Sequence, residues 1–143
     1  MELIINNLSK RFGEKLILDH LSFSMKSGDF MALVGSSGSG KSTILRLIAG
    51  LDQPSSGSIT VDGTPVSGPG PDRGMVFQKY SLYPWLNAAE NVAFGMRLQR
   101  MKAAEIKERT AYFLEVVGLS DAATKLPREL SGGMQQRVAI ARA

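Results

Sequence analysis

Cysteine is absent from this sequence of 143 residues, and histidine and tryptophan each occur once. The lack of cysteine excludes a disulfide-stapled scaffold and thiolate metal sites. Long apolar runs are missing too: none approaches the ~20 residues that a membrane-spanning helix needs, so any membrane association should go through another protein. The start, MELIINNLSKRF, lacks the basic residues and unbroken apolar stretch of a signal peptide, which predicts a protein that is not exported.

Basic clusters are also missing. The chain has 17 basic and 13 acidic residues and a net charge of +4, but the basic residues are scattered and form no run. A nucleic-acid-binding face favours clustered basic residues with aromatic residues between them, so we expect no nucleic-acid partner. With 43% hydrophobic and 21% charged residues, the composition is that of an ordinary globular domain, and the length fits one domain.

The first part of the chain has the pattern of β-structure. Residues 2–5 and 16–18 are short apolar runs, and residues 21–25 alternate apolar and polar side chains. Together they predict a small antiparallel β region. Residues 58–63, SITVDG, predict an edge-type strand that ends at a turn.

A second pattern indicates a strand–loop–helix unit. Residues 30–35, FMALVG, are apolar throughout and predict a buried parallel strand that leads into a glycine-rich loop. Residues 42–51 then show helical spacing of apolar side chains, with Gly50 suited to the helix C-terminus. Residues 75–78, MVFQ, predict a further strand.

From residue 87 the pattern becomes helical. Asn87 and Glu90 form a plausible capping box at the start of one helix, and a second helix is predicted at about residues 103–117. Pro127 should interrupt a short helical turn, and a last helix should begin near Gly132.

The loop GSSGSGKS matches the phosphate-loop pattern G-x-x-x-x-G-K-[ST] in full. Its residues are Gly35, Ser36, Ser37, Gly38, Ser39, Gly40, Lys41 and Ser42. The glycines let backbone N–H groups turn toward a phosphate at a helix N-terminus. Lys41 should reach the β and γ phosphates, Ser42 should bind Mg²⁺, and Thr43 could donate to the α phosphate. A flexible linker is the alternative, but a linker would not lie between a buried strand and an amphipathic helix.

A second motif, LSGGMQQR at residues 130–137, separates the classes of phosphate-loop protein. An isolated Ser-Gly-Gly could be only a helix cap. Together with the phosphate loop and Gln78 at the end of MVFQ, however, the chain resembles the ATP-binding subunits of ABC transporters. The resemblance implies an α/β phosphate-loop NTPase core with an N-terminal antiparallel β region and a helical subdomain.

The resemblance also implies how the sites are built. Two subunits of the family pack head to tail, and each ATP lies between the phosphate loop of one subunit and the signature motif of the other. In this chain LSGGMQQR, residues 130–137, matches that signature. The signature residues that would contact the nucleotide are Ser131, Gly132, Gly133 and Gln135. Gln78 matches the glutamine that senses Mg²⁺ and the attacking water, the alternative being a polar residue at a strand end. Phe12 matches the aromatic residue that stacks on adenine, and its alternative is a core residue of the small sheet.

Aromatic residues follow Gln78 in the stretch KYSLYPWL. Tyr80, Tyr83 and Trp85 lie where the family contacts its membrane subunit, although they could equally pack the helical region onto the sheet. The surrounding residues 68–95 resemble the subgroup that energises import of nitrate, sulfonates and taurine. The implied partners are a second ATP-binding subunit, transmembrane permease subunits and a solute-binding protein, at the cytoplasmic face of the membrane.

The resemblance covers residues 1–143 as a single incomplete domain. Residues 1–86 would form the β region and phosphate-loop core, residues 87–131 the helical subdomain, and residues 132–143 the start of the signature helix. The family's Walker B strand, with its catalytic Asp-Glu, follows that helix. We therefore expect ATP binding, doubtful hydrolysis by these residues alone, and self-association through uncovered apolar surface.

Two further interpretations remain open at this point. One is a nucleotide-binding module that does not hydrolyse and serves as a scaffold. The other is a different phosphate-loop enzyme, such as a kinase or GTPase, although no guanine-reading N-K-x-D segment occurs.

Overall fold

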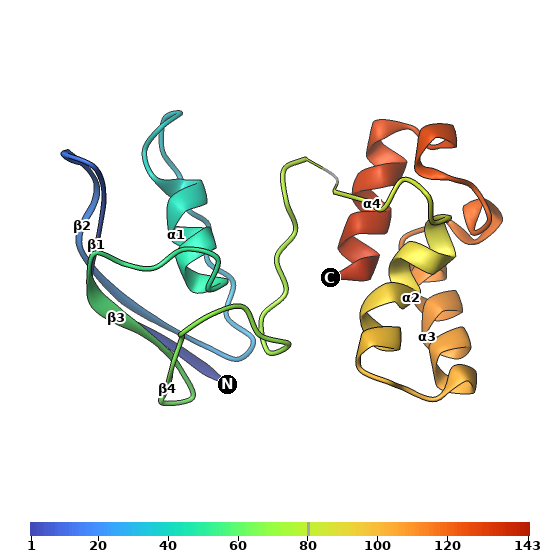
Figure 1. Cartoon of the computed structure of the whole chain (residues 1–143), viewed down its shortest axis with the longest axis horizontal. Helices are drawn as coiled ribbons and strands as arrows, with labels where there is room; N and C mark the ends of the chain where they lie inside the picture. Colours follow the sequence, from blue (N-terminus) through green and yellow to red (C-terminus); the bar gives the residue numbers. More distant parts are fainter. Residues whose placement is uncertain (80) are drawn as a thin grey trace. The chain divides into compact units, whose positions relative to one another are not determined.

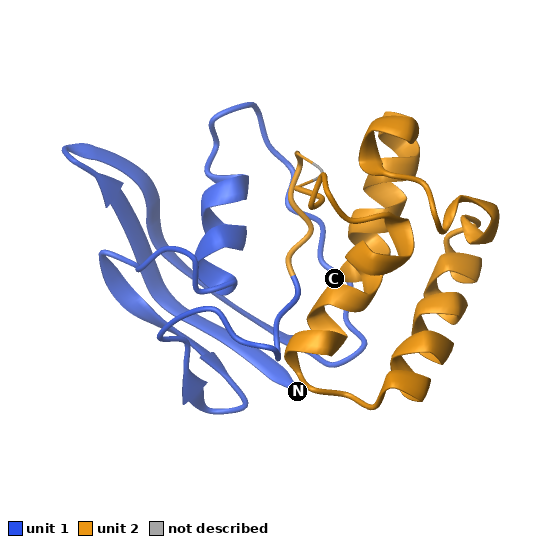
Figure 2. Ribbon diagram, turned by 45° about the vertical axis from the view of Figure 1, so that its right-hand side comes forward, with its two compact units in different colours: residues 1–74 blue, residues 75–143 orange. Residues whose placement is uncertain are grey.

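The computed structural model describes residues 1–79 and 81–143, and these divide into two compact units, residues 1–74 and residues 75–143 (Figure 2). This boundary differs from the predicted division after residue 86. Residues 83–86 belong with the helices because the Asn91 side chain hydrogen-bonds to the backbone of Tyr83 and Leu86.

The first unit contains a four-stranded sheet of order β2-β1-β3-β4, formed by β1 (Glu2–Phe12), β2 (Lys15–Lys26), β3 (Ser56–Val61) and β4 (Thr64–Pro65) (Figure 1). Neighbouring strands are antiparallel, with Glu2 opposite Lys26 and Leu3 opposite Val61. The predicted antiparallel β region is therefore confirmed. The edge position predicted for residues 58–63 is wrong, because a turn at Asp62 and Gly63 folds β4 back onto β3.

Helix α1 (Lys41–Ile48) covers one face of this sheet (Figure 1). Ile44 and Leu47 are buried from the helix against Ile5, Leu8 and Ile59 of the strands. The spacing of three residues puts both side chains on one side of the helix, as the sequence predicts. This core fixes the helix that directly follows the glycine-rich loop.

Two predicted strands do not form. Residues 30–35 are not assigned to a strand and are exposed, with Phe30 and Val34 at 94% and 93% exposure. Residues 75–78 are also irregular, and Val76 and Phe77 are exposed. An apolar run becomes a strand only where a neighbouring backbone accepts and donates its hydrogen bonds. Among the described residues neither segment has such a neighbour.

The second unit contains the helices α2 (Ala88–Leu98), α3 (Ala103–Val116) and α4 (Gly132–Arg142), with 3₁₀ turns η1 (Ser120–Ala122) and η2 (Pro127–Glu129) (Figure 2). The three predicted helices are confirmed, and Pro127 begins the second turn. Their shared core is apolar: its buried members are Ala88, Val92, Leu114, Leu119, Ala122, Leu130 and Val138.

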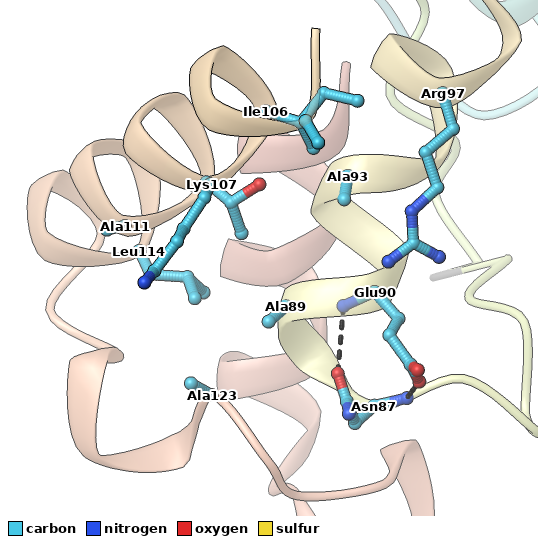
Figure 3. A pocket seen from close by; sticks show the side chains of 12 residues that line it. Asn87, Ala89, Glu90, Ala93, Arg97, Ile106, Lys107, Ala111, Leu114 and Ala123 are labelled. Carbon is cyan, nitrogen blue, oxygen red and sulfur yellow. Dashed lines mark hydrogen bonds between the residues drawn. The ribbon is translucent and has the colours of Figure 1, made fainter.

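The start of α2 is fixed by the predicted capping box. The Asn87 side chain accepts from the Glu90 N–H at 2.8 Å, and the Glu90 carboxylate accepts from the Asn87 N–H at 2.9 Å (Figure 3). In the part of the chain that the structure describes, no helix is long and apolar enough to cross a membrane.

Candidate functional site

The phosphate loop connects the exposed segment before it to the N-terminus of α1. Lys41 Nζ donates to the carbonyl oxygens of Gly35 and Ser36 at 2.8 and 2.7 Å, and to Ser39 Oγ at 3.3 Å. The lysine thus bridges both ends of its own loop. This places the one cation of the loop beside the backbone that must approach an anion.

The backbone of the loop requires glycine. Gly38 and Gly40 have φ of 82° and 91°, a region that residues with a Cβ rarely adopt. A Cβ at Gly35 would lie 2.7 Å from Ser39 Oγ, and one at Gly40 would lie 2.9 Å from Leu18 Cδ2. The sequence therefore leaves a cradle that side chains at these positions would fill.

The N-terminus of α1 suits an anion. Gly40 is its N-cap and offers no side-chain cap. The first backbone N–H groups of a helix have no partner inside the helix, and the helix dipole is positive at this end. Ser42 is exposed and Thr43 is half-buried in this first turn. The arrangement fits a bound phosphate.

The C-terminal end of α1 is tied down by an ion pair. Arg46 Nε and Nη2 donate to the two carboxylate oxygens of Asp52 at 2.7 and 3.0 Å. This hydrogen bonding from Arg46 lowers the pKa of Asp52, and Asp52 in turn raises the pKa of Arg46. The pair joins the last turn of α1 to the residues that follow the helix, at the opposite end from the phosphate loop.

Phe12 ends β1 and is 53% exposed, so it is not a core residue of the sheet. Lys10 Nζ lies 5.0 Å from the centroid of its ring. An exposed aromatic face beside a cation is able to stack on a planar base.

A magnesium ion at the phosphate loop would have to bind without a cluster of acidic or histidine side chains. The described residues contain no group of three or more His, Cys, Asp or Glu that could hold a metal ion. Mg²⁺ typically keeps several waters and uses one or two protein ligands together with substrate phosphates. The exposed Ser42 hydroxyl fits that pattern.

Gln78 lies in the second unit, at an exposed bend. Two side chains that the sequence analysis missed hold residues within 81–86. Asn91, fully buried, accepts from the Tyr83 N–H at 2.8 Å and donates to three backbone carbonyls. The position of Asn91, a polar residue on the apolar side of α2, is the feature of the sequence that could have indicated this role.

The second missed residue is Arg142 of α4. Its Nη1 donates to the Ser81 carbonyl at 2.9 Å, its Nη2 to Ser81 Oγ at 3.1 Å, and its guanidinium lies 5.4 Å from the Tyr83 ring centroid. This contact joins the signature helix to the segment that follows Gln78.

Of the three aromatic residues named above, Tyr83 packs between two rings, and Trp85, whose ring centroid lies 5.6 Å from that of Tyr83, stays largely exposed. The Tyr83 ring lies 4.4 Å from Phe94, between centroids, whereas Trp85 is 71% exposed. Tyr80 lies outside the described residues.

The signature residues build the start of α4. Ser131 is the N-cap, and its Oγ accepts from the Met134 N–H at 3.3 Å. Gln135 Nε2 donates to the carbonyls of Pro127 and Leu130, which fixes the turn before the helix. Gly132 and Gly133 are exposed. The structure thus brings Phe12 and the phosphate-loop residues together in one unit, and Gln78 and the signature in the other.

Comparisons with known proteins identify the family to which the matched residues belong. The family model described as "ABC transporter" matches residues 18–143. The nitrate import ATP-binding protein NrtD of Synechocystis sp. is 53% identical over 99% of this chain and 55% of its own length. The sulfate/thiosulfate import ATP-binding protein CysA of Mycobacterium tuberculosis is 46% identical over 99% of this chain and 41% of its own length. The taurine import ATP-binding protein TauB of Sinorhizobium fredii is 47% identical over 90% of this chain and 48% of its own length.

The chain therefore spans about half the length of the curated relatives that it matches. Among solved structures, the dimeric post-hydrolysis state of the ATP-binding cassette MJ0796, bound to ADP and Pi, matches with a TM-score of 0.85 and 35% identity. That match covers 98% of this chain and 68% of the other. The fold class is thus confirmed as a mixed α/β phosphate-loop cassette. The chain belongs to the family of ABC transporter ATP-binding domains.

Proposed function

We propose that this chain binds ATP together with Mg²⁺ and serves the energy-coupling step of solute import. The observation that carries the proposal is the glycine cradle with Lys41 folded onto it at the N-terminus of α1. Lys41 would exchange its loop carbonyls for the β and γ phosphates. A bond from the ammonium to a phosphate joins opposite charges, whereas the bonds that it replaces join the ammonium to neutral carbonyl oxygens.

The other nucleotide contacts would come from the same loop and from two residues outside it. Ser42 would bind Mg²⁺, with Gln78 sensing the ion and the attacking water, and Thr43 would donate to the α phosphate. Phe12, exposed at the end of β1, would stack on adenine. Bound Mg²⁺ would neutralise developing charge on the phosphates during hydrolysis.

We propose further that two copies pack head to tail. Ser131, Gly132, Gly133 and Gln135 of one copy would then complete the ATP site of the other. Support comes from the exposed glycines at the N-terminus of α4, and from the solved structures described as dimeric cassettes. ATP would stabilise the dimer because it binds the associated state more tightly than the separated one.

The import direction rests on the relatives, which are import proteins for nitrate, sulfate or thiosulfate, and taurine. We place the protein at the cytoplasmic face of the membrane, bound to permease subunits that receive solute from a solute-binding protein. The exposed Trp85 is the aromatic residue available for the permease contact, since Tyr83 is already packed.

Sedimentation velocity tests the two-copy site. Mg²⁺-ATP should shift the wild-type chain toward a dimer, and Lys41→Ala should abolish the ATP-dependent part of that shift. Lys125→Ala removes an exposed lysine of the helical unit and should behave like the wild type. A shift that is equal in Lys41→Ala and wild type, or no shift in either, would contradict the proposal.

A further inference from the structure

The helical unit contains a pocket that the nucleotide chemistry does not use. It has a volume of about 450 Å³ and lies between α2 and α3, with Ala123 at its end (Figure 3). Its apolar lining residues include Ala89, Ala93, Ile106, Ala111 and Leu114. Sites for small ligands are usually apolar cavities of about this size that carry a few polar groups.

One of those polar groups is a buried hydroxyl. Thr110 lines the pocket and is 8% exposed, and its Oγ1 has no hydrogen-bond partner among the described residues. A threonine inside a helix commonly bonds the carbonyl four residues earlier. An unpartnered buried hydroxyl is costly, so a ligand atom that bonds it would be favoured.

Charge at the rim selects the sign of that ligand. Arg97 and Glu90 extend from α2, and Figure 3 shows the Arg97 guanidinium directed to the same end of the pocket as Glu90. One is positive and the other negative, so the α2 side of the pocket carries no net formal charge. Lys107, on α3, forms no ion pair within the described part of the chain, so the α3 side of the pocket is cationic.

Lys107 and Thr110 are three residues apart on α3, which makes them neighbours on the helix surface. A single head group could therefore meet both. A carboxylate supplies an acceptor for the Thr110 hydroxyl and a negative charge for the Lys107 ammonium.

We propose that this pocket binds a small amphipathic carboxylate, with its hydrocarbon chain between α2 and α3 and its carboxylate at Thr110 and Lys107. The site is separate from the phosphate loop and needs no nucleotide. It goes beyond the proposed transport function, because neither depends on the other.

Titration of the 143-residue chain with octanoate tests the proposal, followed by the methyl resonances of Ile106 and Leu114. We expect saturable shifts with octanoate, and much weaker ones with 1-octanol, which has the same chain length and no charge. Butyrate, with a shorter chain, should also bind weakly. Equal binding of octanol, or no saturable shift with octanoate, would overturn the assignment. Binding of an acidic helical peptide without binding of octanoate would overturn it too.

A pair of alanine substitutions on α3 provides a matched control. Ala111 lines the pocket and Ala104 does not, and both are exposed on the same helix. Ala111→Phe should fill the pocket and abolish octanoate binding, whereas Ala104→Phe should leave the affinity unchanged. Retained binding in Ala111→Phe would show that octanoate binds elsewhere.

Thr110→Val removes the hydroxyl and keeps nearly the same side-chain volume, so it tests the contribution of the hydroxyl to binding. The variant should bind octanoate about three- to tenfold more weakly, the range expected for the loss of one hydrogen bond. Its free form should melt at the same temperature as the wild type or higher, because an unpartnered buried hydroxyl has been removed. Unchanged affinity in a folded Thr110→Val chain would exclude the threonine from the site.

Discussion

At the scale of single residues, the geometry of the phosphate loop depends on neighbouring residues and very little on residues far away in the sequence. The backbone of the loop could be predicted because it depends on contiguous residues: glycines where φ is positive and a lysine at the helix start. Asn91 and Arg142 could not be predicted as site-forming residues. Arg142 bonds Ser81, 61 residues away, and no local pattern indicates that partner.

Gly40→Ala tests the backbone requirement. The new Cβ would be held at φ of 91° and would lie 2.9 Å from Leu18 Cδ2. We expect a loss of about 1–3 kcal/mol in the free energy of unfolding, from backbone strain. Gly68→Ala is the control, since its Cβ would meet nothing within 4 Å and its φ is not positive. Equal denaturation midpoints for the two variants would contradict the prediction.

The Asp52–Arg46 pair makes a prediction about pH. Because the pKa of Asp52 is lowered in the folded chain, its carboxylate stabilises the fold at pH values above the ordinary range of an aspartate, ~4. That stabilisation is lost as the pH falls through the lowered pKa. Arg46 stays protonated throughout, so its raised pKa adds no pH dependence over this range.

Urea unfolding of wild type and Asp52→Asn at a series of pH values provides the measurement. The wild type should be the more stable at neutral pH, and the difference should shrink toward zero in acid. A difference that stays constant from neutral to acid pH would show that the ion pair does not anchor α1.

At the scale of elements, the sequence predicts correctly the helices that neighbouring residues encode. It predicts wrongly the two strands that would depend on distant partners. The helices of the second unit could be predicted because the capping box at Asn87 and Glu90, and the glycine after α3, are encoded locally. Residues 30–35 could not be assigned correctly from their apolar character, since a strand exists only with its neighbour. The same reasoning explains the failure at residues 75–78.

Arg142→Ala tests the tie between α4 and the segment after Gln78. The variant loses two hydrogen bonds to Ser81 and the contact with the Tyr83 ring. We expect the helical unit to lose about 1–2 kcal/mol of stability and the last turn of α4 to exchange its amide hydrogens faster. Arg142→Lys should fall between, and Arg128→Ala, at an exposed position of η2, should change neither quantity. Unaltered exchange at the end of α4 in Arg142→Ala would refute the tie.

At the scale of the molecule, each of the two units has its own core, and apolar side chains remain exposed beside the phosphate loop. Phe30 and Val34 are almost fully exposed, at 94% and 93%. Exposed apolar residues at this density favour association.

The 143-residue chain should therefore self-associate without ATP, to an extent that rises with concentration in sedimentation velocity. Replacing Phe30 by Ser and Val34 by Thr should reduce this association. Leu98→Ser is the control, because Leu98 is 70% exposed but lies in the other unit. A wild-type chain that stays monomeric at every concentration would contradict this prediction.

The central claim is that the glycine-rich loop holds the phosphates of ATP, and isothermal titration of the chain with Mg²⁺-ATP tests it most directly. Wild type and Lys125→Ala should bind with one affinity, and Lys41→Ala should bind about ten- to hundredfold more weakly, as the loss of charge-assisted hydrogen bonds predicts. Equal affinity in Lys41→Ala and wild type, or no binding by a folded wild-type chain, would contradict the account.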